Sequence, residues 1–510
     1  MILLLLLAGC GGRSHSSDPR DPAAAVDAEG ASWMLVTPPL GEVRVAVLQI
    51  LVNVEGLLGV VDLVRERYEV DLGDEDVIDG LGLAVDRPLV ALGLAEGTCL
   101  VLGARSAIPL EDILKQVGTT SGYRVEQRVA AQGRLTRIYD GERCIVALLG
   151  LDGLVLLGYS PAGRADAAVA RVALHHLPDG GSGVEAPEGR FLFEWRGGDP
   201  LVGAPDVTGW PGPLAGVGHW LHGMMAQIRT LRLTFAADLD GIDWDLEIVD
   251  AHPSIGPPST PRIDVVDWKD AVPEDAVLTL QLRAGTAATL GALLGGKGMY
   301  LLGLVAGEVL DKKQIPALQE ALEAMGSEVA LVLLGADPRA PVNEIVAPGS
   351  VLQALNSVHV GVLVRGAPPQ AILDRIPTED GPVAGGWTAR SISQGVLRAV
   401  EFCKAKADRS LCVGLLAGED RLMFVSGKGE TDRLVRVWTG AAPALGASLF
   451  VGRATGDVIL TLKLKRLVRD LRSKGVPPFY LRMVNSFLEV QAVRTHSGKG
   501  MRIEGEVLLR

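Results

Sequence analysis

Aromatic residues and long uncharged runs are scarce in this chain of 510 residues. Phe, Trp and Tyr together make up 4% of the sequence, although 48% of it is hydrophobic. The two most apolar segments, 45–64 and 286–310, are interrupted by charged residues or glycines. Neither offers the ~20 nearly uncharged residues that a membrane-spanning helix needs. We expect both to be buried helices, with helices lining an apolar ligand cavity as the alternative.

An excess of positive charge is also missing. The chain carries 49 Lys and Arg against 61 Asp and Glu, so its formal net charge is −12. A general nucleic-acid binder needs a basic face. The charge balance therefore argues against nucleic acid as a partner, and it suits a protein that faces the periplasm or the cell exterior. The length allows at least two hydrophobic cores.

The N-terminal residues indicate where the protein resides. Six apolar residues follow Met1, and Ala8, Gly9 and Cys10 come next. This L-A-G-C ending resembles the lipobox of bacterial lipoproteins, in which a peptidase cuts before the cysteine and the cysteine carries the lipid. The resemblance implies a signal peptide at residues 1–9 and lipidation at Cys10. A frayed apolar N-terminus with a chance cysteine is the alternative.

The residues after Cys10 extend this expectation. Segment 10–32 is rich in Gly, Ser, Pro, Asp and Ala, which is typical of a flexible tether. Gly11 stands where an aspartate would imply retention in the inner membrane of many Gram-negative bacteria. The resemblance therefore implies a lipid anchor in the outer membrane, with the protein facing the periplasm.

Cysteine is sparse, and no two cysteines have the C-x-x-C spacing of zinc sites. Apart from Cys10 there are four, and an even number in an oxidising compartment favours disulfides. We favour the pairs Cys99–Cys144 and Cys403–Cys412, because each stays within one half of the chain. Buried free thiols are the alternative. We expect no metal site.

The two halves of the chain share a hydrophobic pattern. Aligned on Cys144 and Cys412, residues 142–160 and 410–428 both consist of a strand, a short acidic or glycine-containing turn, and a second strand. Further upstream, each half has a strand followed by a helix with proline in its first turn. Further downstream, each has a hairpin with a glycine-containing turn. This order resembles that of bacterial envelope proteins of unknown function that carry such repeats.

Segments such as 243–248 alternate between polar and apolar residues, which is typical of antiparallel strands with one wet face. We therefore expect an α+β fold of two tandem related domains, each an antiparallel sheet with helices packed on one face. Prolines and hydroxyl residues mark a linker at 252–264. The two domains are then 33–251 and 265–510.

Two motifs imitate known catalytic or binding loops. Segment 291–298, GALLGGKG, resembles a phosphate-binding loop, but Gly298 stands where Ser or Thr must hold magnesium. We expect a flexible break in an apolar region there. Ser160, in G-Y-S-P-A-G, lacks the correctly placed second glycine of a nucleophile elbow. We expect it to be a helix N-cap before Pro161.

Histidine and acidic clusters are the remaining candidates. His219 and His222 could share a helical face, but no H-E-x-x-H pattern surrounds them. The acidic run at 238–247 does not match a calcium loop, so we expect the wet face of a hairpin. The acidic loop at 71–79 is expected to be a solvated turn. The basic segment 462–475 is expected to be a solvated helix face, with contact to anionic lipid or phosphate as the alternative.

These observations favour a non-enzymatic envelope lipoprotein, without a cofactor, that acts as a binding or assembly module. Its partner would be a protein, a lipid or a glycan, besides the membrane reached through the anchor. The alternative is an envelope hydrolase or metal-dependent enzyme, with a site between the domains drawn from His219, His222, Asp238 and Asp240. Apolar cavities would indicate a lipid ligand, and exposed apolar patches would indicate a protein partner.

Overall fold

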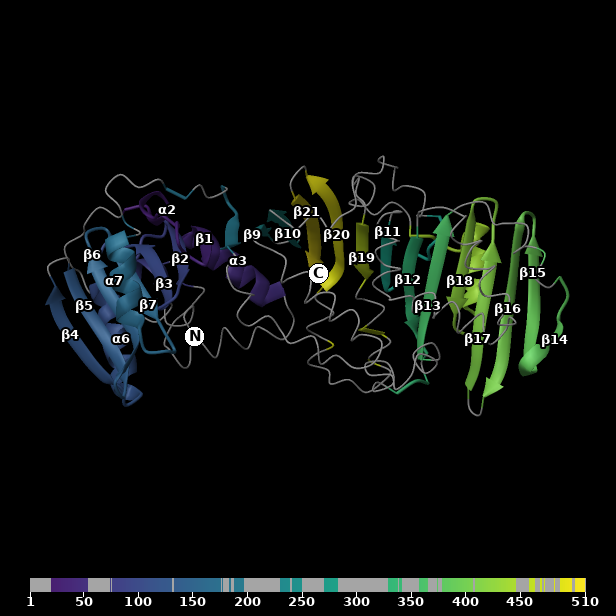
Figure 1. Cartoon of the computed structure of the whole chain (residues 1–510), viewed down its shortest axis with the longest axis horizontal. Helices are drawn as coiled ribbons and strands as arrows, with labels where there is room; N and C mark the ends of the chain where they lie inside the picture. Colours follow the sequence, from purple (N-terminus) through teal and green to yellow (C-terminus); the bar gives the residue numbers. More distant parts are fainter. Residues whose placement is uncertain are drawn as a thin grey trace. The chain divides into compact units, whose positions relative to one another are not determined.

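A computed structural model describes two units of the chain, drawn with labelled elements in Figure 1. The described residues up to 249 form unit 1, and those from 270 to 508 form unit 2. The structure describes residues 20–53, 74, 76–130, 133–175, 177, 183–184, 188–196, 230–238, 241–249, 270–282, 329–337, 339–341, 357–365, 374, 378–406, 409–445, 458–463, 468–469, 472, 481, 487–497 and 500–509.

Unit 1 contains an antiparallel sheet with the strand order β4-β5-β6-β7-β3-β2-β1-β8-β9-β10. Short turns join several neighbours; an Asp152-Gly153 pair closes the β6–β7 hairpin, where φ of Gly153 is +72°. The strands are β1 (Trp33–Pro39), β2 (Pro88–Leu94), β3 (Gly97–Gly103), β4 (Arg124–Ala130), β5 (Gly133–Asp140), β6 (Arg143–Leu151), β7 (Leu154–Tyr159), β8 (Phe191–Arg196), β9 (Thr230–Ala237) and β10 (Gly241–Val249).

Unit 2 contains a second antiparallel sheet, with the order β14-β15-β16-β17-β18-β13-β12-β11-β19-β20. The strands from residue 278 onward are β11 (Leu278–Leu282), β12 (Val329–Ala336), β13 (Val358–Arg365), β14 (Gly381–Val383), β15 (Trp387–Gln394), β16 (Leu397–Lys406), β17 (Arg409–Ala417), β18 (Arg421–Ser426), β19 (Val458–Lys463), β20 (Phe487–Ser497) and β21 (Gly500–Leu509).

The two sheets connect their strands in the same order. When β14 is left out, the strands β1 to β9 of unit 1 correspond one to one with the strands β11 to β20 of unit 2. Each pair has the same rank along the chain and the same position in its sheet. The predicted strand–turn–strand pairs at 142–160 and 410–428 are confirmed as the hairpins β6–β7 and β17–β18. The downstream hairpin predicted in the first half is confirmed as β9–β10.

Helices pack on both faces of the unit 1 sheet, so the expectation of helices on one face is wrong. The reason is that β2 and β3 alternate two sets of apolar side chains: Leu89 and Ala91 belong to one cluster, Val90 and Leu92 to the other. Each face then needs its own cover. On the first face lie α3 (Leu40–Asn53), α5 (Val77–Gly80) and α6 (Ile108–Thr120), and on the second lie α2 (Pro22–Ala25) and α7 (Ala165–His175).

In unit 2, α15 (Glu430–Trp438) packs on β16, β17 and β18. Its Leu434 and Val435 join the core with Met423 and Val425 of β18. A single 3-10 turn, η4 (Ala384–Gly386), leads from β14 into β15. Apolar residues on the opposite face of these strands form a separate cluster, which includes Val400 and Leu422.

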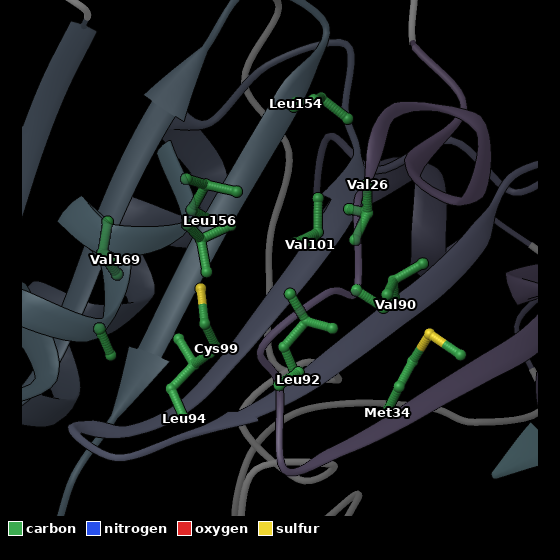
Figure 2. Close-up of a cluster of buried hydrophobic side chains, with 14 of the residues drawn as sticks. Val26, Met34, Val90, Leu92, Leu94, Cys99, Val101, Leu154, Leu156 and Val169 are labelled. Carbon is green, nitrogen blue, oxygen red and sulfur yellow. The ribbon is translucent and has the colours of Figure 1, made fainter. Parts of the chain in front are cut away.

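The segment before β1 packs in the hydrophobic core under α7 (Figure 2). Val26 and Met34 pack against Val90, Leu92 and neighbouring side chains of the central strands. Ala23, Ala25, Ala28 and Ala31 are also buried. The expected tether at 10–32 is therefore wrong for its described part, residues 20–32, because small apolar side chains between the prolines and aspartates fit closely over the sheet. Residues 1–19, including Cys10, lie outside the described part.

One predicted disulfide is formed. Cys403 of β16 and Cys412 of β17 face each other in register, with their Cα atoms 4.2 Å apart, and their sulfurs are bonded. That spacing is typical of a non-hydrogen-bonded pair in an antiparallel ladder. The predicted Cys403–Cys412 pair is thus present in the structure.

The other predicted disulfide, Cys99–Cys144, is not formed, and both cysteines are buried free thiols. The strand order explains this. Cys99 of β3 pairs with Gly158 of β7, and Gly158 pairs on its other side with Ala147 of β6. Cys99 is therefore two strand spacings, roughly 9–10 Å, from β6, and Cys144 lies three residues farther along that strand. Disulfides need Cα atoms within about 7 Å.

Among the described helices, none is both long enough and apolar enough to cross a membrane.

A thiol count tests these cysteine assignments. In a Cys10→Ser chain, denaturation without reductant should expose two thiols, Cys99 and Cys144, and reduction should raise the count to four. In the native protein both thiols should react slowly with an aromatic disulfide reagent, because burial raises the pKa of Cys144 to about 11 and also raises that of Cys99. A count of zero in denaturant before reduction would mean that the two are bonded after all.

Candidate functional site

The apolar face of α3 and the sheet beneath it enclose a cavity in unit 1. On α3, the residues that line it are Leu40, Val43, Arg44, Val47 and Leu48. Their spacing of i, i+3, i+4, i+7 and i+8 is the stripe that an α-helix turns toward a core. The helix therefore presents one continuous wall, with Arg44 as the charged member of that wall.

The sheet supplies the opposite wall. Because successive side chains of a strand point to opposite faces, alternate residues of β1, β2 and β3 reach the cavity. They are joined by residues of the α5 region and by the first residue of β8. These lining residues are Trp33, Leu35, Thr37, Leu89, Ala91, Thr98, Leu100, Leu102, Ile78, Leu81, Leu83 and Phe191.

Trp33 holds its place in this wall because Gly93 lies directly across from it on β2. A Cβ atom at Gly93 would overlap the Trp33 indole, so glycine is needed for the ring to lie flat there. Thr37 is buried, but its hydroxyl accepts a hydrogen bond from the Leu89 amide at 2.9 Å and donates to the Pro38 carbonyl at 2.7 Å. The one buried hydroxyl of the β1 wall is thus already satisfied within the protein.

The cavity measures about 410 Å³ and is lined almost entirely by carbon. Protein interiors normally leave few voids larger than a water molecule, whereas ligand pockets typically measure about 300–1,000 Å³. Water gains few hydrogen bonds from such a wall, so an apolar cavity favours an apolar occupant. Its chemistry suits a hydrocarbon chain better than a sugar or a nucleotide.

Among the described lining residues, the charged one is Arg44. Its Nη1 donates a hydrogen bond of 3.4 Å to the backbone carbonyl of Asp74, on the exposed side. Long basic side chains commonly lay their aliphatic stem along apolar surface and keep their charged end toward solvent. Arg44 is half-buried, which fits such an arrangement.

One of the two apolar segments noted in the sequence contributes residues to the cavity wall. Residues 45–53 of segment 45–64 belong to α3, and Val47 and Leu48 line the cavity. The alternative reading of this segment, a helix along an apolar cavity, is thus confirmed for Val47 and Leu48. Residues 54–64 and the whole of segment 286–310, with the loop-like 291–298, lie outside the described residues.

Of the residues considered for a catalytic site between the domains, the structure describes Asp238 alone. His219, His222 and Asp240 lie outside the described residues. Asp238 follows β9, and its Oδ1 accepts a hydrogen bond from the Gly241 amide at 2.9 Å, which closes the β9–β10 hairpin. A turn-forming role fits this geometry.

Ser160 does not cap a helix, so that prediction is wrong. Its hydroxyl is buried and donates to the Glu96 carbonyl at 2.6 Å, and α7 begins only at Ala165. Residues 161–164 form a turn first, because the chain must leave β7 before the helix can pack back on the sheet. The helix α7 ends at His175.

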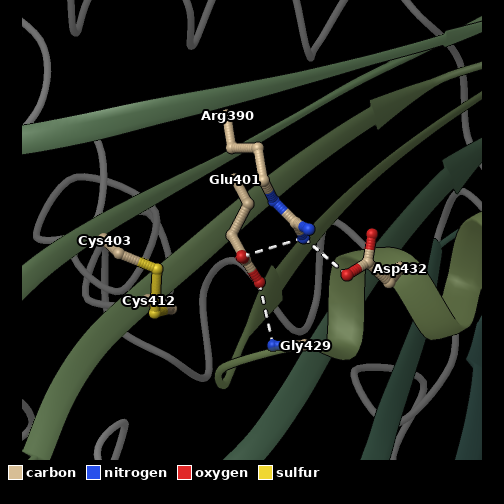
Figure 3. The surroundings of a disulfide bond; sticks show 6 residues. All are labelled: Arg390, Glu401, Cys403, Cys412, Gly429 and Asp432. Carbon is tan, nitrogen blue, oxygen red and sulfur yellow. Dashed lines mark hydrogen bonds and ion pairs between the residues drawn. A yellow bond between two sulfur atoms is a disulfide. The ribbon is translucent and has the colours of Figure 1, made fainter. Parts of the chain in front are cut away.

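Buried carboxylates were missed in the sequence, and Glu111 and Glu401 are two of them. Glu111 of α6 accepts hydrogen bonds from Arg134 at 3.1 Å and Gln127 at 3.3 Å, and burial raises its pKa. Glu401 of β16 accepts hydrogen bonds from Arg390 at 3.2 Å and from the Gly429 amide at 2.9 Å (Figure 3). No sequence signal marks either, because their partners come from distant elements.

Glu401 lies close to the disulfide, on the same strand as Cys403 (Figure 3). The carboxylate and the sulfurs of Cys403 and Cys412 are within 4.8 Å of one another. A metal would need thiolates there, and the bond between the two sulfurs occupies both. Arg390 also bonds Asp432 of α15 at 2.6 Å, so this group ties the helix to the sheet.

A second network surrounds the start of α15. Nδ1 of His359 lies 2.9 Å from Oε1 of Glu430, and Arg433 donates to Oε2 of the same carboxylate at 2.8 Å. Arg433 also pairs with Asp275. Burial alone would raise the pKa of Glu430, but hydrogen bonds and charges from His359 and Arg433 outweigh burial and hold that pKa below its usual value.

Comparison with known proteins finds a weak likeness to solved structures. No protein-family model matches the sequence, and no curated protein matches it either. Among solved structures, crystal forms III, IV and I of TP0453 are similar, with sequence identities of 10%, 11% and 10%. Their TM-scores are 0.27, 0.26 and 0.26; the matches cover 46%, 46% and 48% of this chain and 81% of TP0453. The likeness is too weak to support any conclusion about function.

The pKa of Glu430 leads to a pH-dependent prediction. A carboxylate whose pKa is lower in the folded than in the unfolded state stabilises the protein above the unfolded value, and this contribution disappears as pH falls through the folded value. Glu430→Gln should therefore reduce the free energy of unfolding of unit 2 at pH 7 by about 1–3 kcal/mol. The difference from wild type should shrink below the ordinary glutamate pKa of 4.5.

Chemical denaturation at pH 7 and at pH 3.5 measures this difference. The matched control is Glu419→Gln, because Glu419 is exposed in the β17–β18 turn. A Glu430→Gln deficit that is equally large at both pH values would contradict the role of the ionised carboxylate.

Proposed function

We propose that this protein is a non-enzymatic, lipid-anchored protein of the bacterial envelope that binds a single-chain lipid within unit 1. The observation that carries the proposal is the cavity of about 410 Å³ between α3 and strands β1–β3. Its walls are apolar on both sides, and burial of each CH₂ group of a ligand contributes about 0.8 kcal/mol. A hydrocarbon chain of modest length would therefore bind usefully there.

A lipid fits these observations better than the other two partner classes. A glycan needs several convergent polar groups, and the cavity wall has few. A protein partner needs a continuous exposed apolar patch. The large apolar side chains that are exposed among the described residues are scattered over separate elements; they are Val45, Ile108, Tyr123, Val129, Leu174 and Val396.

The proposal includes an origin by duplication, with two tandem related domains. Supporting it are the shared strand order and the shared hydrophobic pattern around Cys144 and Cys412. In each unit, moreover, an arginine of the sheet pairs with an aspartate in the first turn of the helix that follows the matching hairpin. These pairs are Arg137–Asp166 at 3.4 Å and Arg390–Asp432 at 2.6 Å.

The proposed location is the outer membrane, on its periplasmic side, with the lipid of Cys10 as the anchor. The support comes from the L-A-G-C ending at residues 7–10 and from the Cys403–Cys412 disulfide, since disulfides persist in oxidising compartments. A protein held at a membrane surface would meet single-chain lipids directly. The anchor and the cavity thus fit one function.

Binding of cis-parinaric acid, a fluorescent fatty acid, tests the cavity. The wild-type protein should bind it saturably, at one site per chain. Val47→Trp should weaken binding roughly tenfold or more, because the indole would displace at least two methylenes of the probe. Val45→Trp is the matched control: Val45 lies on the same helix, is 42% exposed and does not line the cavity.

Circular dichroism establishes that both variants fold before binding is compared. Equal affinity of Val47→Trp and wild type would show that the probe binds elsewhere, and the absence of saturable binding by the wild type would refute the lipid-binding function.

The anchor is tested by growing a bacterial host with an alkyne-tagged fatty acid. The wild-type chain should carry the tag and sediment with membranes, and Cys10→Ser should lose the tag and be released from the membrane fraction. Cys99→Ser is the control, since Cys99 is a buried core residue. Tagging that persists in Cys10→Ser would contradict lipidation at this residue.

A further inference from the structure

We propose that the edge strand β4 pairs in antiparallel fashion with β4 of a second copy of this chain, across a twofold axis at Gln127. The two unit 1 sheets then join into one sheet. This interaction surface is independent of the lipid anchor and of the cavity. The proposal starts from the position of β4 in its sheet and from the order of its side chains.

β4 is the outermost strand of the unit 1 sheet (Figure 1). In the described part of the chain it pairs with β5 alone. An edge strand presents unpaired N–H and C=O groups, which are a template for pairing with a strand of another chain. Val129 of β4 is 88% exposed, so this edge is open to such a partner.

The side chains of β4 divide between the two faces of the sheet. The odd-numbered residues lie on the α6 face, because Gln127 donates a hydrogen bond to Glu111 of α6 at 3.3 Å. The even-numbered residues lie on the other face, and they include the charged Arg124, Glu126 and Arg128. A twofold axis perpendicular to the sheet pairs each residue with one on the same face. Charged residues would therefore meet charged residues across the axis.

One register matches these charges. When Gln127 lies opposite Gln127 of the second copy, Glu126 lies opposite Arg128, and Arg128 lies opposite Glu126. On the α6 face, Val125 and Val129 then oppose each other on both sides of the axis. Opposite charges and β-branched apolar residues are favourable cross-strand pairs. β4 is thus self-complementary about its central residue.

The neighbouring registers bring like charges together. With Glu126 on the axis, Glu126 would face its own copy and Arg124 would face Arg128. With Arg128 on the axis, two arginines would face each other. Like charges directly opposite one another destabilise a sheet, so the charges select the register centred at Gln127.

This interface would rely on backbone hydrogen bonds and charge pairs, so it needs no broad apolar patch. Arg124 already donates to Glu126 at 2.6 Å within the strand, but an ionised carboxylate has about four acceptor positions and can also accept from Arg128 of the second copy. One strand pair buries a small area, so we expect a dimer that dissociates on dilution.

Sedimentation velocity of the full chain carrying Cys10→Ser tests the dimer. This chain should form dimers as its concentration rises. Glu126→Arg and Arg128→Glu should each weaken self-association about tenfold or more, because each replaces two opposite-charge pairs by two like-charge pairs. The control is Glu419→Arg, in an exposed turn of unit 2, which should leave self-association unchanged.

A mixture of the two charge variants separates pairing from a purely structural role. In the mixed pair, two arginines of one chain face two glutamates of the other. The mixture should therefore dimerise although each variant alone does so poorly, and the double variant Glu126→Arg/Arg128→Glu should regain self-association. Loss of local structure in the variants would produce neither result.

Cross-linking through Gln127→Cys locates the axis. Residues directly opposite in an antiparallel pair have Cα atoms roughly 4.5–5.5 Å apart, which is within the range for a disulfide. Oxidised glutathione should therefore convert this variant to a covalent dimer. Val396→Cys is the control, because Val396 is 68% exposed in unit 2; it should stay largely monomeric.

Three results would overturn the proposal. They are a chain with unchanged β4 that stays monomeric at every concentration, a mixture of the charge variants that stays monomeric, and equal cross-linking of Gln127→Cys and Val396→Cys. Circular dichroism verifies that each variant folds. None of these results bears on lipid binding in the cavity, so the two proposals fail separately.

Discussion

Burial of β2 and β3 on both faces is the constraint on which the rest of unit 1 depends. Each strand alternates apolar side chains between two clusters, so the sheet is stable only when both faces are covered. On one face the short segment at α2 and helix α7 pack closely, with small residues near the sheet. On the other face α3 lies over β1, and about 410 Å³ between them stays open. The cavity therefore exists because α3 does not fill the space over its face of the sheet.

The difference between the two faces gives unit 1 a division of roles. The α7 face carries the dense core, with Cys99, Val101, Leu154 and Leu156 fully or almost fully buried, and such packing supplies stability. The α3 face is packed less densely, and apolar residues together with Arg44 line the space that remains. A ligand chain that fills the space would restore the lost contacts, which links binding to stability. Occupied and empty forms of the protein should therefore differ in stability.

Much of the local structure was predictable from the sequence, whereas the site was predictable only in outline. The hairpins β6–β7, β9–β10 and β17–β18 carry strong turn signals, and the proline in the first turn of α6 marks its start.

Which faces of the sheet are covered was harder to predict. Runs such as residues 88–94 are apolar at every position, so periodicity could not show that both sides are covered. The Cys99–Cys144 pairing failed because it depends on strand order, and the 20–32 segment was taken for a tether because its small residues suit both a linker and a close-packed layer. Segment 45–64 did indicate a cavity helix, but its partners on the sheet come from residues far apart in sequence.

Native mass spectrometry of the protein, purified from a bacterial envelope under mild conditions, tests the central claim most directly. The account predicts an added mass equal to one single-chain lipid per chain, which is released on denaturation and is absent from Val47→Trp. A bare chain mass that stays unchanged after incubation with palmitate would contradict it, as would an adduct that Val47→Trp retains in full.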